Sequence, residues 1–352
     1  MDSLTQIVLG AAAGEAVLGK KIGNKAMVWG AIGGTIPDLD VLGQFFLSNL
    51  DNIGFHRGIS HSISFSIVGS VIFGWLVFQL YKWWYTKKPD KIQLATVRDW
   101  QWLFFWSLFT HPILDCFTMY GTELFAPFSD ARIAWATISV ADPLYTVPFL
   151  VCLLVAARHH KTSNKRRFWN YLGIGLSSVY LLFTVFNKQR VDRVFAQALT
   201  DQNIPVERFI TNSTILNNVL WNCTAETKDH FYVAHYSLFD EAEISFSKFE
   251  KNHQLLKNAD TDPTITALRW FTKDYFSVNA VGDQLQFNDL RFGTFYAKGD
   301  TPKDFVFRFM LDDQGEAGYH LNKTAGGPEP GEGKKMMSDL WTRIWGIKKG
   351  TD

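Results

Sequence analysis

The first half of the chain alternates between long apolar stretches and short polar connectors. Four stretches have the length and composition of helices that cross a membrane, for which about 20 apolar residues are needed. They are roughly Ser62–Tyr81, Trp100–Phe117, Ile138–Ala157 and Phe168–Phe186. Two shorter stretches rich in Gly and Ala precede them, about Leu4–Leu18 and Ala26–Pro37. The pattern predicts a mainly α helical bundle, in which the short pair forms either close-packed half-helices or two tilted ordinary helices.

The second half of the chain is polar, and its apolar residues follow another rhythm. Residues 188–205 continue the helical pattern of the last long stretch. Short aromatic-rich runs come next, and several alternate apolar and polar residues as half-buried strands do. These runs are Phe231–Phe239, Ile244–Phe249, Gln284–Leu290 and Phe305–Met310. Val281-Gly282-Asp283 is typical of a hairpin turn. We therefore expect a small α+β domain with an antiparallel sheet.

The change of composition near Asn187–Arg190 divides the chain into three parts. We expect a membrane-embedded domain over 1–187, the α+β domain over 188–323, and a linker with an amphipathic helix over 324–352. The linker, Thr324–Lys335, is rich in Gly, Pro and Glu. Helical spacing then places a set of apolar residues on one face: Met337, Leu340, Trp341, Ile344 and Trp345. We expect this helix to lie on the outer membrane surface, with docking on the α+β domain as the alternative.

Basic residues between the apolar stretches predict an orientation in the bilayer. Three connectors carry them: Lys20, Lys21 and Lys25; Lys82, Lys87, Lys88, Lys91 and Arg98; Arg158, Lys161, Lys165, Arg166 and Arg167. By the positive-inside rule these connectors are cytoplasmic. The connectors around residues 38–61 and 119–137, and everything after Phe186, are then outside the cytoplasm.

Composition narrows the function classes. A net charge of +1 argues against a broad nucleic-acid-binding surface, so no nucleic-acid partner is expected. The 13 Trp suit aromatic belts at a membrane interface. The three Cys form no CxxC pair and imply no disulfide framework. Because a basic N-terminal region is missing and Glu15 interrupts the first apolar run, no cleavable signal peptide is expected.

Four polar clusters occur at the ends of apolar stretches. They are Pro37-Asp38-Leu39-Asp40, His56-Arg57-Gly58-Ile59-Ser60-His61, His111-Pro112-Ile113-Leu114-Asp115 and Ala141-Asp142-Pro143. The predicted topology brings all four to the outer leaflet. Imidazoles and carboxylates bind divalent metals. Ionisable groups at membrane depth are energetically costly, so their presence there indicates a function. The sequence predicts one composite metal site with these ligands: Asp38, Asp40, His56, His61, His111, Asp115 and Asp142.

Each cluster also has a simpler reading. His111 and Asp115, four residues apart, share a helix face, and a hydrogen bond between helices would explain them equally well. Pro112 predicts a break or bend at His111, which is tolerable where the backbone lines a cavity. Asp38 and Asp40 suit a turn at a helix end and could be caps.

The remaining cluster residues leave similar alternatives open. His56 suits a loop and His61 the start of the next helix, with Ser60 as a candidate N-cap. Arg57 could hold a phosphate or carboxylate, or pair with Asp51. Asp142, before Pro143, could be a simple cap.

Several motifs of the first 150 residues occur in the same order in a known family. They are Asp2-Ser3-Leu4-Thr5, Ile36-Pro37-Asp38-Leu39-Asp40, His56-Arg57-Gly58-Ile59-Ser60-His61-Ser62, His111-Pro112-Ile113-Leu114-Asp115, Thr118-Met119-Tyr120-Gly121, Leu124-Phe125-Ala126-Pro127-Phe128-Ser129 and Ala141-Asp142-Pro143. With these motifs the chain resembles the YdjM family of bacterial inner-membrane proteins, described as predicted membrane-bound metal-dependent hydrolases. One departure is Gln6, which stands where the family commonly has His.

The resemblance implies a protein of the bacterial inner membrane. The apolar stretches and the charge pattern add a multi-pass topology with an extracytoplasmic C-terminal domain. The family's arrangement of His and Asp residues also resembles, more distantly, that of zinc-dependent phospholipases C and single-strand nucleases. This more distant resemblance would imply phosphoester hydrolysis by a metal-activated water. Zinc is the divalent metal expected first, with manganese or magnesium as alternatives. Arg57 would steady an anionic substrate, and Asp38 or Asp115 could be the general base.

Two hypotheses follow for the function. The first is a hydrolase that acts on a phosphoester, a membrane lipid or a lipid-linked small molecule; a peptidase is disfavoured because HExxH is missing. The second is a non-catalytic, metal-stabilised membrane scaffold or binding protein, whose protein partner the sequence does not identify.

Overall fold

The computed structural model describes residues 1–86, 95–257, 259–294, 305–326 and 333–348. Lys87, Lys88 and Lys91, and residues 327–332 of the predicted linker, lie outside the described residues. The chain forms two compact units. The first comprises Met1–Gly43 and Phe55–Thr184, and the second comprises Gln44–Gly54 and Val185–Asp352.

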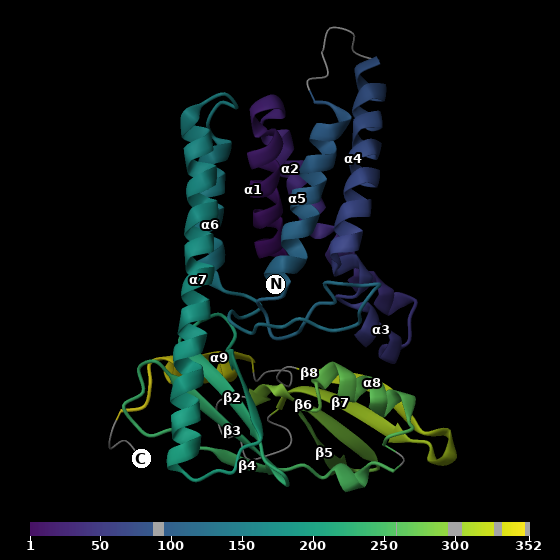
Figure 1. Cartoon of the computed structure of the whole chain (residues 1–352), viewed down its shortest axis with the longest axis vertical. Coiled ribbons are helices and arrows are strands. Elements are labelled where there is room, and N and C mark those ends of the chain that lie inside the picture. Colours follow the sequence, from purple (N-terminus) through teal and green to yellow (C-terminus); the bar gives the residue numbers. More distant parts are fainter. Residues whose placement is uncertain (87–94, 258, 295–304, 327–332, 349–352) are drawn as a thin grey trace. The chain divides into compact units, whose positions relative to one another are not determined.

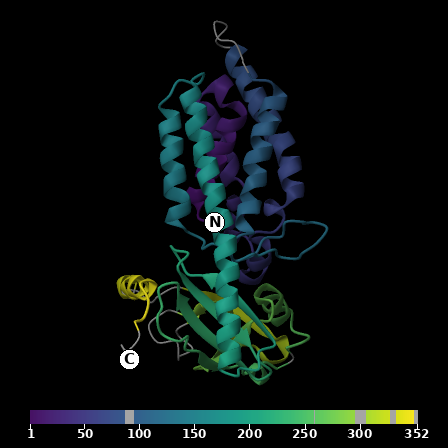
Figure 2. The same ribbon diagram turned by 60° about the vertical axis from the view of Figure 1, so that its left-hand side comes forward.

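The first unit is helical. Its helices are α1 (Ser3–Ile22), α2 (Asn24–Thr35), α4 (Ile63–Thr86), α5 (Val97–Asp115), α6 (Pro143–Ala157) and the first part of α7 (Asn164–Asp201). Short 3-10 helices η1 (Pro37–Phe45) and η2 (Ile59–His61) precede α4, as does α3 (Asn49–Phe55), which belongs mostly to the second unit. Figures 1 and 2 show the long helices running side by side as a bundle. The predicted mainly helical first region is confirmed.

The prediction of four long spans is wrong. Among the described residues, only α4 and α7 are both long and apolar enough to cross a membrane. The helix α6 is apolar but has 15 residues, about 22 Å of helix against a hydrocarbon core of about 30 Å. The helix α5 has 19 residues and includes Arg98, Asp99, Gln101, His111 and Asp115. Their polar side chains lower its hydropathy.

The short N-terminal pair packs as close half-helices do. Gly10 and Gly14 of α1 face Gly30 and Gly34 of α2, and a Cβ on any of them would collide with the opposite backbone. Small residues allow this approach, as the alternative of close-packed helices requires. The α1–α2 pair in turn packs on α5.

Local details differ from the sequence pattern at two helix ends. Pro112 does not interrupt α5, which stays helical to Asp115. A break at His111 is therefore not observed, because the helix continues for only three residues after Pro112. Ser62, not Ser60, caps α4: its Oγ accepts a hydrogen bond from the Phe65 amide at 2.9 Å.

The second unit holds two four-stranded antiparallel sheets. The first has the order β1 (Arg208–Ser213), β2 (Leu220–Glu226), β3 (His230–Ser237) and β4 (Ser247–Glu250). The second has the order β5 (Phe276–Val281), β6 (Gln284–Thr294), β7 (Phe305–Asp313) and β8 (Tyr319–Gly326). With α8 (Pro263–Thr272) and α9 (Gly333–Ile344), this confirms a small α+β domain. Gly282, at φ +60°, lies in the predicted β5–β6 hairpin.

The C-terminal helix α9 docks on the second unit. Leu340 is buried, and Arg343 makes an ion pair with Asp240 at 2.6 Å. Trp345 stacks on Phe239 with ring centroids 5.7 Å apart. Docking, the predicted alternative, is thus observed, while Trp341 and Trp345 remain exposed. The predicted linker is wrong over residues 324–326, which belong to β8 and pair with β7.

Candidate metal centre

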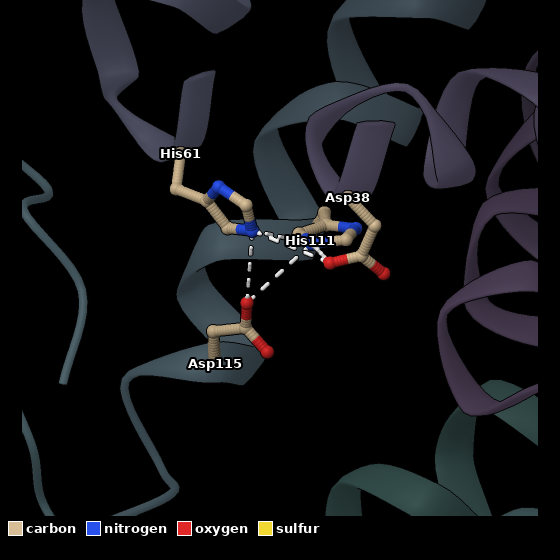
Figure 3. Close-up of side chains that lie close together, drawn as sticks. All are labelled: Asp38, His61, His111 and Asp115. Carbon is tan, nitrogen blue, oxygen red and sulfur yellow. Dashed lines mark hydrogen bonds and ion pairs between the residues drawn. The ribbon is translucent and has the colours of Figure 1, made fainter. Parts of the chain in front are cut away.

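Four side chains of the first unit converge on one point (Figure 3). Asp38 comes from η1, His61 from η2, and His111 and Asp115 from the last turns of α5. One ligand atom of each lies within 4.8 Å of the others. His61 Nε2 and His111 Nε2 are 3.1 Å apart. Each lies 3.4–3.5 Å from an oxygen of Asp38 and 3.4 Å from Oδ2 of Asp115.

These spacings suit a small divalent ion. Ligand atoms placed about 2.0–2.1 Å from a tetrahedral zinc ion lie about 3.3–3.4 Å from one another. The observed distances of 3.1–3.5 Å fall around that value. The residue types, two imidazoles and two carboxylates, are ligands for zinc and for harder ions such as manganese. The cluster could therefore bind a metal ion.

Hydrogen bonds at the far side of each ring set the imidazole tautomers. His111 Nδ1 donates to the Gly34 carbonyl at 2.6 Å, and His61 Nδ1 lies 3.2 Å from Oδ2 of Asp40. The Gly34 carbonyl only accepts, so His111 Nδ1 carries a proton. His61 Nδ1 also lies 3.0 Å from Ser60 Oγ, and because that hydroxyl donates its hydrogen to Asp40, His61 Nδ1 is the donor here too. In a neutral ring the Nε2 lone pair then faces the cluster. Four acceptor atoms then meet without a donor among them, which requires a cation at their centre or protonation of an imidazole.

The two oxygens of Asp115 are used differently. Its Oδ1 accepts hydrogen bonds from Gln6 Nε2 at 3.1 Å and from the amino group of Met1. Its Oδ2 is buried, faces the imidazoles and has no hydrogen-bond partner among the described residues. A buried carboxylate oxygen without a partner is costly. A metal ion bound there would satisfy it.

Asp40 supports the cluster from outside. It accepts hydrogen bonds from Ser60 Oγ at 3.0 Å and from the Arg57 amide at 2.9 Å, besides contacting His61. Burial alone would raise the pKa of Asp40, but hydrogen bonds with His56 and His61 hold that pKa well below its usual value. Asp40 therefore stays ionised and orients His61, as carboxylates behind metal-binding imidazoles do. Asp38 is similar: burial acts to raise its pKa, and hydrogen bonds with His111 and His61 lower it.

Asp40→Asn tests this role. The amide keeps the shape but is a poorer acceptor for His61 Nδ1–H, so we expect metal affinity to fall about 10–100-fold, the usual effect of removing an outer carboxylate. Titration of the purified apoprotein with zinc would measure it. Asp51→Asn, an exposed carboxylate of α3, serves as the control and should leave the affinity unchanged. Equal affinities for Asp40→Asn and wild type would contradict the role.

Arg57 lies at the edge of the cluster. Its backbone has φ +61°, which is uncommon outside glycine, and its N–H donates a hydrogen bond to Oδ2 of Asp40. Its Nη1 donates to Thr118 Oγ1 at 2.9 Å, and its Nε lies 3.6 Å from Oδ2 of Asp115. The guanidinium also covers the Tyr120 ring at 4.9 Å. A cation is thus fixed beside the cluster, where an anionic ligand of the metal would come.

The structure places the remaining predicted ligands outside the four-residue cluster. His56 Nδ1 pairs with Oδ1 of Asp40 at 2.9 Å. Asp142 accepts from the Leu144 amide at 2.9 Å as the cap of α6, and from the Tyr180 hydroxyl at 2.8 Å. Ligand roles for Asp40, His56 and Asp142 stay predictions. Sequence reasoning gave no role to Thr118 and Tyr120, although the motif Thr118-Met119-Tyr120-Gly121 contains both.

The sequence profile of the YdjM inner membrane protein family matches residues 1–191, more than half of the chain. The chain belongs to the YdjM family. The match includes every residue of the cluster and its surroundings, and membership together with the apolar helices α4 and α7 indicates a membrane protein.

This member of the YdjM family is also similar to a curated protein, the uncharacterized protein YfhP of Bacillus subtilis (strain 168). The two are 27% identical over 162 residues. The matched segment covers 44% of this chain and 46% of YfhP, so the chain spans about half the length of that relative. No solved structure matches the chain significantly.

Proposed function

We propose that this protein is a membrane-bound, metal-dependent hydrolase that cleaves a phosphoester or lipid-linked substrate at the outer face of the inner membrane. The observation that carries the proposal is the meeting of two imidazole nitrogens and two carboxylate oxygens, from Asp38, His61, His111 and Asp115, at the spacing of metal ligands. Zinc is the first candidate, and manganese or magnesium are alternatives.

The arrangement supports a catalytic centre rather than a closed structural one. The side chains of His61, His111 and Asp115 are fully buried, whereas that of Asp38 is 21% exposed. The cluster is therefore accessible from the side of Asp38. Catalytic metal sites keep a coordination position open, whereas structural sites are closed by four protein ligands. With Asp38 acting as the base instead of as a ligand, His61, His111 and Asp115 would leave that position on the exposed side.

Each residue has a role in the proposed reaction. His61, His111 and Asp115 would hold the metal, which when bound lowers the pKa of water and polarises a phosphoryl oxygen. Arg57 would bind the anionic oxygens of the substrate from the edge of the cluster. Asp38, the most exposed carboxylate, would accept a proton from the attacking water. Asp40 and the Gly34 carbonyl would keep the two imidazoles in place.

The surroundings of Asp38 favour a lipid-linked substrate. Leu39, Val41 and Leu42 on the same 3-10 helix are each about half exposed. Apolar side chains beside the open edge would contact an acyl or prenyl chain while Arg57 holds its phosphate.

We further propose a multi-pass topology with the α+β unit outside the cytoplasm, supported by the basic connectors of the first unit.

A metal-stabilised scaffold without catalysis is the second candidate. Gln6 favours it, because a neutral amide beside Asp115 stands where the family commonly has His. In that case the cluster would tie η1, η2 and α5 together, and the metal would contribute only stability.

Metal content and turnover together test the proposal. Detergent-purified full-length wild type and His61→Ala would be compared by mass spectrometry for bound metal, and by phosphate release from phospholipid and prenyl-phosphate substrates. We expect stoichiometric metal and turnover in wild type, both lost in His61→Ala. His160→Ala, an exposed residue after α6, is the matched control. Metal without turnover would support the scaffold, and no metal in wild type would overturn both.

A further inference from the structure

A second polar site lies at the other end of α1. Gln6, near the start of α1, contacts the metal cluster, and Lys21 lies in its last turn, so the 20-residue helix separates them by about 20–25 Å. A cavity of about 130 Å³ is present there. Its polar lining includes Lys21 of α1, Lys25 of α2 and Lys161 of the α6–α7 turn, all from connectors that the charge pattern predicts to be cytoplasmic. Figure 1 shows the α1–α2 corner at the end of the bundle away from the N-terminus.

The three ammonium groups are incompletely neutralised. Lys21 pairs with Asp99 at 2.5 Å. Lys161 donates to the Lys21 carbonyl at 3.0 Å, and Lys25 lies over the rings of Tyr81 and Trp84 at 5.6 and 5.3 Å. Within the described part of the chain, neither Lys25 nor Lys161 has a carboxylate partner. Two positive charges are therefore available to an anion in the cavity.

One of the residues that line the cavity has an unsatisfied donor. Trp100 of α5 is 1% exposed, and its Nε1–H has no hydrogen-bond partner among the described residues. A buried donor without a partner costs free energy, which an acceptor atom at this wall would recover.

An apolar hollow adjoins the basic cavity. It measures about 260 Å³ and shares Lys25 and Tyr81 with the cavity. Its other walls are aromatic or aliphatic: Trp29, Leu80, Trp83 and Trp84. Trp83 and Leu80 are about half exposed on α4, one of the two helices able to span a membrane. Trp and Tyr at such a place are typical of the boundary between headgroups and acyl chains.

We propose that this double site binds one anionic phospholipid, with its phosphate among Lys25, Lys161 and Trp100 and its glycerol and upper acyl chain in the aromatic hollow. Basic pockets between membrane helices on the cytoplasmic side bind anionic headgroups in this way. A free phosphate ion would use only the basic cavity and would leave the adjoining apolar hollow without a ligand. The joint presence of both compartments therefore favours the lipid.

Native mass spectrometry of the full-length, detergent-purified protein tests the proposal. Phosphatidylglycerol is the anionic probe, and phosphatidylcholine is the zwitterionic comparison. Wild type should retain phosphatidylglycerol in preference to phosphatidylcholine. In the double variant Lys25→Gln/Lys161→Gln we expect its affinity to fall about 25-fold, since each Lys near an anionic headgroup contributes about fivefold.

Controls separate the site from general charge and from folding. Lys82→Gln/Lys165→Gln removes the same charge from exposed lysines outside the cavity and should bind as wild type does. Lys25→Arg keeps the cation and should retain the lipid. All variants should keep the metal content of wild type, because the two sites lie at opposite ends of α1.

Three results would overturn the proposal. One is an equal loss of phosphatidylglycerol affinity in both double variants, which would indicate non-specific attraction. Another is equal retention of phosphatidylglycerol and phosphatidylcholine. The third is full displacement of the lipid by millimolar inorganic phosphate, which would make this a site for the free ion.

Discussion

Asp115→Asn is expected to abolish metal binding and turnover while the protein still folds and inserts. Oδ2 of Asp115 faces both imidazoles and accepts no hydrogen bond from the described residues, with Arg57 Nε 3.6 Å away. Its Oδ1 is already held by Gln6 and the Met1 amino group. The amide keeps the volume but removes the negative charge. Its NH2 group would also present a donor either to the imidazoles and the metal or to Gln6. Because even outer carboxylates contribute about 10–100-fold to metal affinity, we expect a loss of more than about 100-fold.

Zinc titration and phosphate release from a lipid substrate would measure this effect. The control is Asp142→Asn, the same chemical change at another buried carboxylate of the first unit. Asn caps a helix about as well as Asp, so α6 should keep its stability and the metal should remain bound. Full activity in Asp115→Asn would exclude the proposed centre. Loss of metal in Asp142→Asn would instead bring Asp142 into the ligand set.

The convergence of the cluster could be predicted from the sequence, but its membership could not. Alternating apolar stretches and basic connectors placed four polar clusters on one side of the bilayer. Which side chains meet there depends on the backbone between them. The 3-10 turn at η2 directs His61 inward, while His56, five residues earlier, is left beside Asp40 at the rim. Spacing alone does not distinguish these two imidazoles.

The fold shows the same division. The β5–β6 hairpin followed from Gly282, which supplies the positive φ that the turn needs. The strand β2 was missed because all seven of its residues are buried, including Asn222, Thr224 and Glu226, so alternation gives no signal. The number of spans was overestimated for the opposite reason. Apolar composition in α6 was clear, but its length is set by Asp142 and Pro143 at its start, which the pattern had placed inside the span.

Glu15→Ala is expected to have the largest effect on stability. Glu15 of α1 makes a two-fold hydrogen-bonded ion pair with Arg166 of α7, at 2.6 and 2.5 Å, and both side chains are almost fully buried. Arg166 also donates to Asn24 and to the His159 carbonyl. Removing Glu15 alone leaves a buried, partly unpaired guanidinium. Breaking a buried pair in this way costs about 3–5 kcal/mol.

The unfolding temperature of each variant in detergent would measure this loss of stability. It is read from the amount of folded protein that remains after heating. The matched variant is Glu15→Met/Arg166→Met, which removes both charges and fills the space with apolar side chains. Such replacements are often neutral or stabilising, so the double variant should unfold at a higher temperature than Glu15→Ala. If Glu15→Ala unfolds at the wild-type temperature, the pair does not hold α1 to α7. If the double variant is the less stable of the two, the charge left on Arg166 is not the cause of the loss.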